Sequence, residues 1–99
     1  MELLVSATEQ TTEGLLVHGI MNAGSVHIGS VFTHVVRRAS EGTPSSTEVV
    51  NFSVRRIVAY RHELDELEPG MGGSLLVDVP SLDVRWGDLL VGPDSPNVA

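Results

Sequence analysis

Short apolar segments rich in β-branched residues follow one another along the chain with no helical spacer between them. Their brevity and their composition favour strands over helices. We expect strands over residues 2–8, 15–21, 25–29, 31–36, 48–60, 74–79 and 89–91. Strands in direct succession are typical of an antiparallel meander or barrel. The pattern therefore predicts an all-β fold, a small antiparallel β-barrel that is closed or partly open.

The longest of these segments, residues 48–60, alternates regularly in its first half. Its apolar residues recur at every second position and so share one face of the strand, namely Val50, Phe52 and Val54. The alternation is lost after Arg55 and Arg56, because residues 57–59 are all apolar. A β-bulge near these two arginines would restore the phase, and barrels use bulges to turn corners.

Polar and glycine-containing stretches separate the expected strands. Residues 9–14 are interpreted as a polar hinge, residues 22–24 and 80–83 as turns, and residues 37–47 (RRASEGTPSST) as a loop around Gly42 and Pro44. Leu64 and Leu67 lie three residues apart, which allows one turn of helix between His62 and Leu67. Residues 1–92 are expected to form one domain, and residues 93–99, with two prolines and no core pattern, a frayed tail.

Composition narrows the class of protein. Ninety-nine residues suit one domain, and 41% apolar with 19% charged residues is ordinary for a soluble globular chain. The first residues, MELLVSATEQ, lack the basic and apolar regions of a signal peptide, and no apolar run approaches the roughly 20 residues of a membrane-spanning helix. There is no cysteine, which excludes disulfides and thiolate zinc sites and fits a reducing compartment. We expect a cytoplasmic protein without membrane association.

The charge distribution excludes several functions. A net charge of −7 argues against general nucleic-acid binding, which requires clustered cations. All six basic residues are arginines, so there is no lysine for Schiff-base chemistry or for a phosphate-binding GxxxxGK[ST] loop. The chain is therefore expected not to bind GTP. Arginine suits bidentate pairing with carboxylates, which is the expected role of most of these side chains.

Catalytic and metal-binding patterns are weak. No GxSxG nucleophile elbow occurs, and Ser25 and His27 on one strand would lie too far apart for a nucleophile–base hydrogen bond. The histidines are scattered over different elements, at positions His18, His27, His34 and His62. The first three could meet on adjacent strands, so a small-molecule or metal-binding protein remains an alternative. The acidic residues 63–68 lack the spacing of a calcium loop. We expect no enzyme, no cofactor and no metal.

The order of several short motifs carries a resemblance. The first is GLLVHGIMNAG followed by VHIGSVF over residues 14–32; the second covers residues 54–70 with Tyr60-Arg61 and LDE; the last are GSLLV at 73–77 and WGDLL at 86–90. Together they resemble the second domain of translational GTPases such as elongation factor Tu, a small antiparallel β-barrel. The match covers residues 3–92. The resemblance implies a barrel of the translation-protein domain 2 type, without the GTPase domain.

In elongation factor Tu this barrel helps to hold the aminoacylated end of tRNA through an acidic and a basic residue. Arg61 falls on the basic position, whereas Val58 occupies the acidic one and lacks the carboxylate. This departure and the negative net charge disfavour tRNA as a ligand, and fold resemblance alone does not transfer function. The expected binding residues lie on the same stretch of chain: Tyr60, Arg61, Arg55, Arg56, Glu63, Asp65 and Glu66.

Several expected strands are apolar on both faces, although a barrel interior takes only alternate residues. We therefore expect part of the outer surface, including Leu16, Leu76 and Trp86, to be buried in a homo-oligomer or against a partner protein. The function predicted from the sequence is a non-enzymatic module for protein–protein interaction. The alternatives are a translation-associated module that binds RNA or a translation factor, in which Arg55, Arg56 and Arg61 would converge, and the small-molecule or metal-binding protein named above.

Overall fold

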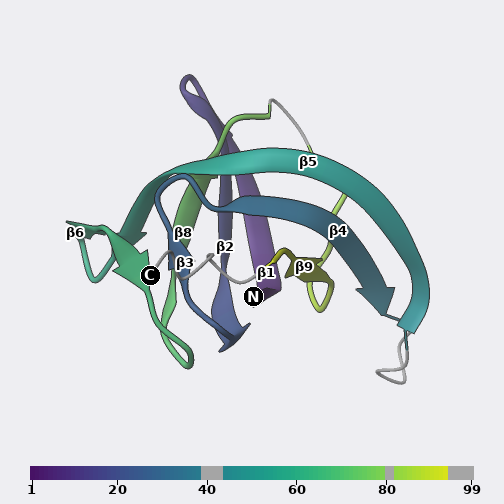
Figure 1. The fold of residues 1–99 in the computed structure, drawn as a ribbon. Coiled ribbons are helices and arrows are strands. Elements are labelled where there is room, and N and C mark those ends of the chain that lie inside the picture. Colours follow the sequence, from purple (N-terminus) through teal and green to yellow (C-terminus); the bar gives the residue numbers. More distant parts are fainter. Residues whose placement is uncertain (39–43, 80–81, 94–99) are drawn as a thin grey trace.

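All the regular secondary structure in the described part of the chain is β-strand. This structure is a computed structural model that describes residues 1–38, 44–79 and 82–93. The strands are β1 (Glu2–Thr11), β2 (Gly14–Ala23), β3 (Val26–His27), β4 (Val31–Arg38), β5 (Pro44–Ala59), β6 (His62–Leu64), β7 (Glu66–Leu67), β8 (Gly72–Val77) and β9 (Leu89–Val91) (Figure 1). These residues contain no helix, and so none that could cross a membrane. The predicted all-β class is confirmed for them.

Six of the strands form a closed ring. They are hydrogen bonded in the order β4-β9-β1-β2-β8-β5, and β5 pairs in turn with β4. Each of these pairings is antiparallel. β6 continues the sheet from β5, and β3 pairs with β7 in a separate two-stranded sheet. The radius of gyration is 12.5 Å, close to the roughly 13 Å of a compact domain of this length.

β5 closes the ring, because it pairs with β4 as well as with β8. It arches over the other strands, pairs with β4 along its first half, and pairs with both β8 and β6 along its second half (Figure 1). The register with β8 shifts between Val54 and Arg56, so Arg55 is an extra residue on β5. This shift is the bulge that the sequence predicted. It bends the strand and turns the Arg55 side chain outward.

The core lies inside the ring and takes mostly alternate residues of the strands, except in β8, where Leu75, Leu76 and Val77 are all buried. Phe52 and Val54 are buried and Val50 is half-buried, as the alternation in residues 48–54 predicts. Phe52 packs against Phe32 of β4 with ring centroids 5.6 Å apart and ring planes tilted by 33°. Tilted aromatic pairs at this distance add to the roughly 1.5–3 kcal/mol that burial of each ring contributes.

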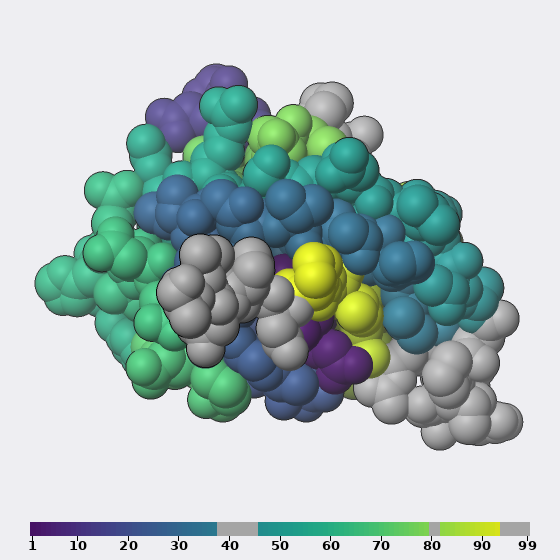
Figure 2. Space-filling view, in the orientation of Figure 1, coloured from purple at the N-terminus to yellow at the C-terminus, as the bar shows by residue number. Residues whose placement is uncertain are grey.

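The first residue of the chain is hydrogen bonded to the residue that follows β9. The N–H of Gly92 donates to the carbonyl oxygen of Met1 at 3.0 Å, and the amino group of Met1 lies 3.2 Å from the carbonyl oxygen of Gly92. Figure 2 shows the purple start of β1 beside the yellow β9, whereas the turn between β1 and β2 projects at the opposite side of the molecule. The ring therefore has one end near Met1 and a second end at the β1–β2 turn.

The helical turn that the sequence allows between His62 and Leu67 is not formed. These residues form β6 and β7, which are separated by Asp65. β6 pairs with the end of β5, and Leu67 pairs with Val26 and is completely buried. A single isolated helical turn makes very few hydrogen bonds for the residues that it orders. Pairing with two strands satisfies the backbone and also buries Leu67, so the extended form is preferred.

The predicted loop over residues 37–47 is too long at both ends. β4 continues through Arg38, and β5 begins at Pro44, with Ser46 opposite Arg37 and Thr47 opposite Val36. The polar composition of this stretch reflects strands that are exposed to solvent, because backbone pairing does not require apolar side chains. The centre of the predicted loop, with Gly42, lies outside the described residues.

Other boundaries differ by a few residues. The hinge expected over residues 9–14 is reduced to Thr12 and Glu13, because β1 and β2 form one long hairpin. Of the residues in the turn expected at 22–24, only Gly24 lies outside a strand, and its φ is 68°. The strands at 25–29 and 74–79 occupy Val26–His27 and Gly72–Val77, and the strand at 89–91 is found as predicted. Residues 80–81 of the predicted turn and 94–99 of the predicted tail lie outside the described residues.

Candidate functional site

The turn between β5 and β6 places Tyr60 and Arg61 at an exposed tip. Ala59 and His62 are the closing pair of this two-residue hairpin. Tyr60 has φ of 53° and Arg61 has φ of 65°, and within the described ranges no other non-glycine residue has positive φ. Two consecutive positive φ values are typical of a type I′ turn, which matches the twist of the flanking strands and normally contains Asn-Gly. Tyr60 is 77% exposed.

The acidic residues after the turn have separate neighbours. Glu63 Oε1 lies 3.0 Å from Nε of Arg56, and Glu66 Oε2 lies 3.8 Å from Nε2 of His27. Asp65 lies between β6 and β7 and is exposed. These carboxylates thus follow one edge of the molecule, next to the Tyr60–Arg61 tip, and two of them already have a basic neighbour.

The bulge on β5 gives Arg55 and Arg56 different surroundings. Arg56 lies between two carboxylates, because its Nη1 contacts Glu13 Oε2 at 3.0 Å while its Nε contacts Glu63. Arg55 lines a surface cavity on the other side of the bulge, and Arg61 lies at the hairpin tip. The two carboxylates more than balance the single positive charge of Arg56. The three arginines therefore occupy three different environments.

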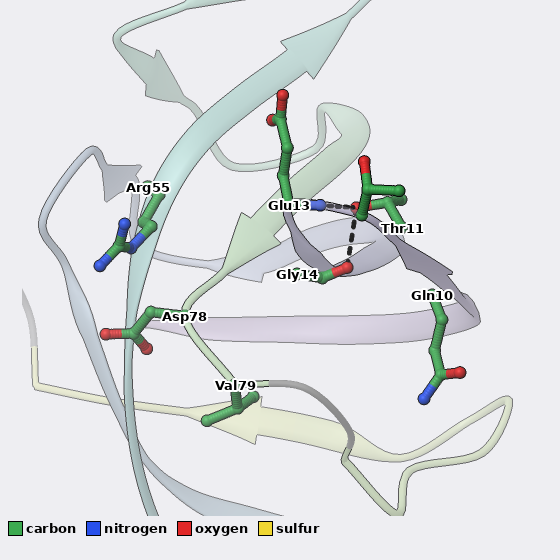
Figure 3. A pocket seen from close by; sticks show the side chains of 8 residues that line it. Gln10, Thr11, Glu13, Gly14, Arg55, Asp78 and Val79 are labelled. Carbon is green, nitrogen blue, oxygen red and sulfur yellow. Dashed lines mark hydrogen bonds between the residues drawn. The ribbon is translucent and has the colours of Figure 1, made fainter.

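A cavity of about 580 Å³ opens at the end of the ring near the β1–β2 turn. Figure 3 shows Arg55 and Asp78 on one side of it, Gln10 on the other, and the turn residues along the rim. Its lining residues are Gln10, Thr11, Thr12, Glu13, Gly14, Arg55, Asp78 and Val79. The rim is ordered by the Thr11 hydroxyl, which donates to the carbonyl oxygen of Gly14 at 2.8 Å and accepts from the N–H of Glu13 at 3.2 Å.

Asp78, directly after β8, is a fixed anion at this cavity. Its Oδ1 accepts the backbone N–H of Ser53 at 2.8 Å, and its Oδ2 accepts the Ser53 hydroxyl at 3.1 Å. The backbone hydrogen bond from Ser53 is the main reason why the pKa of Asp78 is lower than its ordinary value; the Ser53 hydroxyl and the charge of Arg55 add to this effect. The carboxylate is therefore charged at neutral pH.

A second polar arrangement crosses three neighbouring strands on the outer face of the sheet. Ser74 Oγ lies 2.6 Å from Nδ1 of His18, and Nε2 of His18 lies 3.5 Å from Glu9 Oε1. The order resembles a nucleophile, a base and an orienting carboxylate. However, Ser74 is on β8, which is hydrogen bonded to β2 on one side and to β5 on the other. The backbone N–H groups beside Ser74 are thus used in the sheet and are not directed at a developing oxyanion.

The four histidines do not meet at one point. His18 contacts Ser74, His27 lies near Glu66, and His34 Nδ1 lies 2.9 Å from the hydroxyl of Thr33. His62 is exposed in β6. In the ranges 1–38, 44–79 and 82–93, no three His, Asp or Glu side chains are grouped closely enough to hold a metal ion.

The residues expected at an interface have different exposures. Leu76 is 7% exposed and is covered by the chain itself, Leu16 is half-buried, and Trp86 is 81% exposed in the turn before β9. The other exposed large apolar side chains are Ile20, Ile28, Val49 and Tyr60. Of the three expected residues, Trp86 is therefore the one that is most accessible to a partner.

No protein-family model matches the chain, and no curated protein matches it. The candidate site therefore depends on the geometry described above. Sequence patterns indicated Tyr60, Arg61, Arg55 and Arg56. They did not indicate Asp78 or the β1–β2 turn as parts of a cavity, because these segments are far apart in the chain and none of them has a local motif.

Proposed function

We propose that the ring of strands is a β-barrel of the translation-protein domain 2 type and that the protein is a non-enzymatic module that binds another protein. The closed ring of six antiparallel strands and the resemblance to elongation factor Tu support the first part. The observation that carries the second part is the left-handed backbone of Tyr60 and Arg61 at an exposed tip.

This backbone conformation has a cost that the fold does not require. A left-handed residue other than glycine is disfavoured by roughly 1–2 kcal/mol, and an Asn-Gly turn would form the same hairpin without that cost. Strain of this kind is found preferentially at binding and catalytic sites. Tyrosine and arginine are also the residue types that most often dominate protein–protein interfaces. The two side chains are therefore proposed to contact the partner.

The charge of the molecule indicates the chemistry of that partner. The net charge is −7, and Glu63, Asp65 and Glu66 lie beside the tip. A partner with a basic surface would be attracted at long range, whereas RNA would be repelled. Arg56, which an RNA site would need, is already paired with Glu13 and Glu63.

The test removes both side chains without weakening the turn. In the variant Tyr60→Asn with Arg61→Gly, the preferred type I′ sequence replaces the strained one. Wild-type and variant proteins are used as baits in extracts of the native host, and captured proteins are quantified by mass spectrometry. We expect the variant to fold normally and to lose a partner that the wild type captures.

A matched control removes another exposed arginine–aromatic pair. Arg85 and Trp86 lie in the turn before β9, and the variant Arg85→Gln with Trp86→Ser should capture the partner normally. Loss of capture by this control, together with normal capture by the Tyr60–Arg61 variant, would place the interface at Trp86 and refute the proposed hairpin site.

A further inference from the structure

Two opposite charges face the cavity at the β1–β2 end of the ring without forming an ion pair. We propose that this cavity binds a small zwitterion, whose cationic group lies at Asp78 and whose anionic group lies at Arg55. The proposal does not depend on Tyr60 or Arg61, because neither residue lines the cavity.

The cationic end of the ligand would meet a carboxylate that is already oriented. Both oxygens of Asp78 accept hydrogen bonds from Ser53, which holds the carboxylate in place and leaves one lone pair on each oxygen for a further donor. A fixed acceptor loses little conformational entropy when a ligand binds. The backbone of Asp78 is also held, since its N–H donates to the carbonyl oxygen of Ser53 at 3.2 Å.

The anionic end would meet the guanidinium of Arg55, which lines the cavity. The bulge makes Arg55 the extra residue on β5, and Arg55 lines the cavity on the same side as Asp78 (Figure 3). Among the described residues, no hydrogen bond or ion pair within 4.0 Å engages the Arg55 side chain. The neighbouring Arg56, by contrast, is held by two carboxylates. Arg55 is thus the guanidinium on this surface that can form a bidentate pair with a ligand carboxylate.

The proximity of the two charges selects a ligand that carries both. Arg55 is close enough to Asp78 to lower the pKa of that carboxyl, although the two groups are not in contact. A ligand with only a cation would be repelled by Arg55. A ligand with only an anion would be repelled by Asp78 and by Glu13 on the rim. A zwitterion satisfies both charges at once.

The size and lining of the cavity suit such a ligand. Its volume of about 580 Å³ lies within the roughly 300–1,000 Å³ of typical ligand pockets. Val79 provides an apolar surface for a short methylene chain between the two charges, and Thr12 provides a hydroxyl group. The contact between Glu13 and Arg56 keeps the rim in position.

Linear ω-amino carboxylates of increasing length test the proposal, because they vary the charge separation and little else. Each is titrated into ¹⁵N-labelled protein beside the alkylamine and the alkyl carboxylate of matched length. The readouts are the amide signals of Asp78 and Gly14 and the side-chain Nε–H signal of Arg55. We expect one chain length to bind at least about tenfold more tightly than either of its single-charge analogues.

Two variants, each of which removes one of the two charges, assign the contacts. Arg55→Gln should reduce the affinity for the best zwitterion to that of the alkylamine, and Asp78→Asn should reduce it to that of the alkyl carboxylate. Arg85→Gln, at a different turn, should leave it unchanged. If Asp78→Asn does not fold, Arg55→Gln decides the question alone, because Arg55 is the extra residue at the bulge and its side chain is exposed. Equal affinity for zwitterions and single-charge analogues, or no chemical-shift change at millimolar concentrations, would overturn the proposal.

Discussion

Arg56 contacts Glu13 at 3.0 Å although the two residues are 43 positions apart in the chain. The same guanidinium contacts Glu63 of β6, also at 3.0 Å. One side chain on β5 thereby connects the rim of the cavity with the strand that follows the Tyr60–Arg61 tip. The two proposed binding regions are therefore neighbours on the surface.

The contact between Arg56 and Glu13 should position the β1–β2 turn more than it stabilises the fold. Both side chains are about half exposed, at 49% and 58%, and exposed ion pairs contribute roughly 0.2–1 kcal/mol. A double-mutant cycle with Arg56→Gln and Glu13→Gln, followed by urea unfolding, should give a coupling free energy in that range. The coupling should decrease at high salt. A coupling well above this range that does not respond to salt would contradict the expectation.

Arg61→Gly should increase the stability of the protein. The left-handed backbone at φ of 65° is disfavoured for arginine and freely allowed for glycine, so we expect the free energy of unfolding to rise by about 0.5–1 kcal/mol. Arg85→Gly is the matched control, since Arg85 does not have positive φ, and it should cause no gain. Equal effects of the two substitutions in urea unfolding would show that the turn is not strained.

Gly19→Ala should destabilise the ring strongly, whereas Gly72→Ala should be tolerated. A Cβ atom on Gly19 would overlap the carbonyl oxygen of Leu4 on β1, and rigid backbone on the paired strand cannot move away without breaking the pairing. We expect a loss of about 2 kcal/mol or more. A Cβ on Gly72 would meet Ile20 at 3.6 Å, an ordinary contact. Similar melting temperatures for the two variants would argue against the close approach of β1 and β2.

Asp78 should contribute to stability at neutral pH and lose this contribution in acid. Its pKa is lower in the folded protein, mainly through the Ser53 N–H, so the contribution is fully present above the ordinary aspartate pKa of about 3.9. It decreases as the pH falls from there through the folded-state pKa. Carboxyl ¹³C titration by NMR should show the low midpoint directly.

The variant Ser53→Ala separates the two hydrogen bonds to Asp78. It removes the hydroxyl but keeps the backbone N–H, which is the larger cause of the shift. The midpoint of Asp78 should therefore rise only part of the way to its ordinary value. A complete return to that value would mean that the hydroxyl, and not the N–H, is the main partner.

Local alternation predicted those parts of the fold in which one face of a strand is buried. Residues 48–54 show this best, because Phe52 and Val54 are buried and the bulge follows where the alternation ends. The prediction was wrong where strands are polar on both faces, as at Ser46 and Thr47, or where a short segment pairs with distant partners, as at Leu67. Polarity reports exposure, and exposure alone does not distinguish a loop from an exposed pair of strands.

The sequence by itself determined the strand content, the absence of cysteine and lysine, and the negative charge. These are properties of composition and of neighbours in the chain. Only the tertiary structure decided that the β1–β2 turn, Arg55 and Asp78 share one cavity and that Arg56 lies between two carboxylates. Closure of the ring brings these segments together, and closure depends on the register between distant strands, which no local pattern of residues specifies.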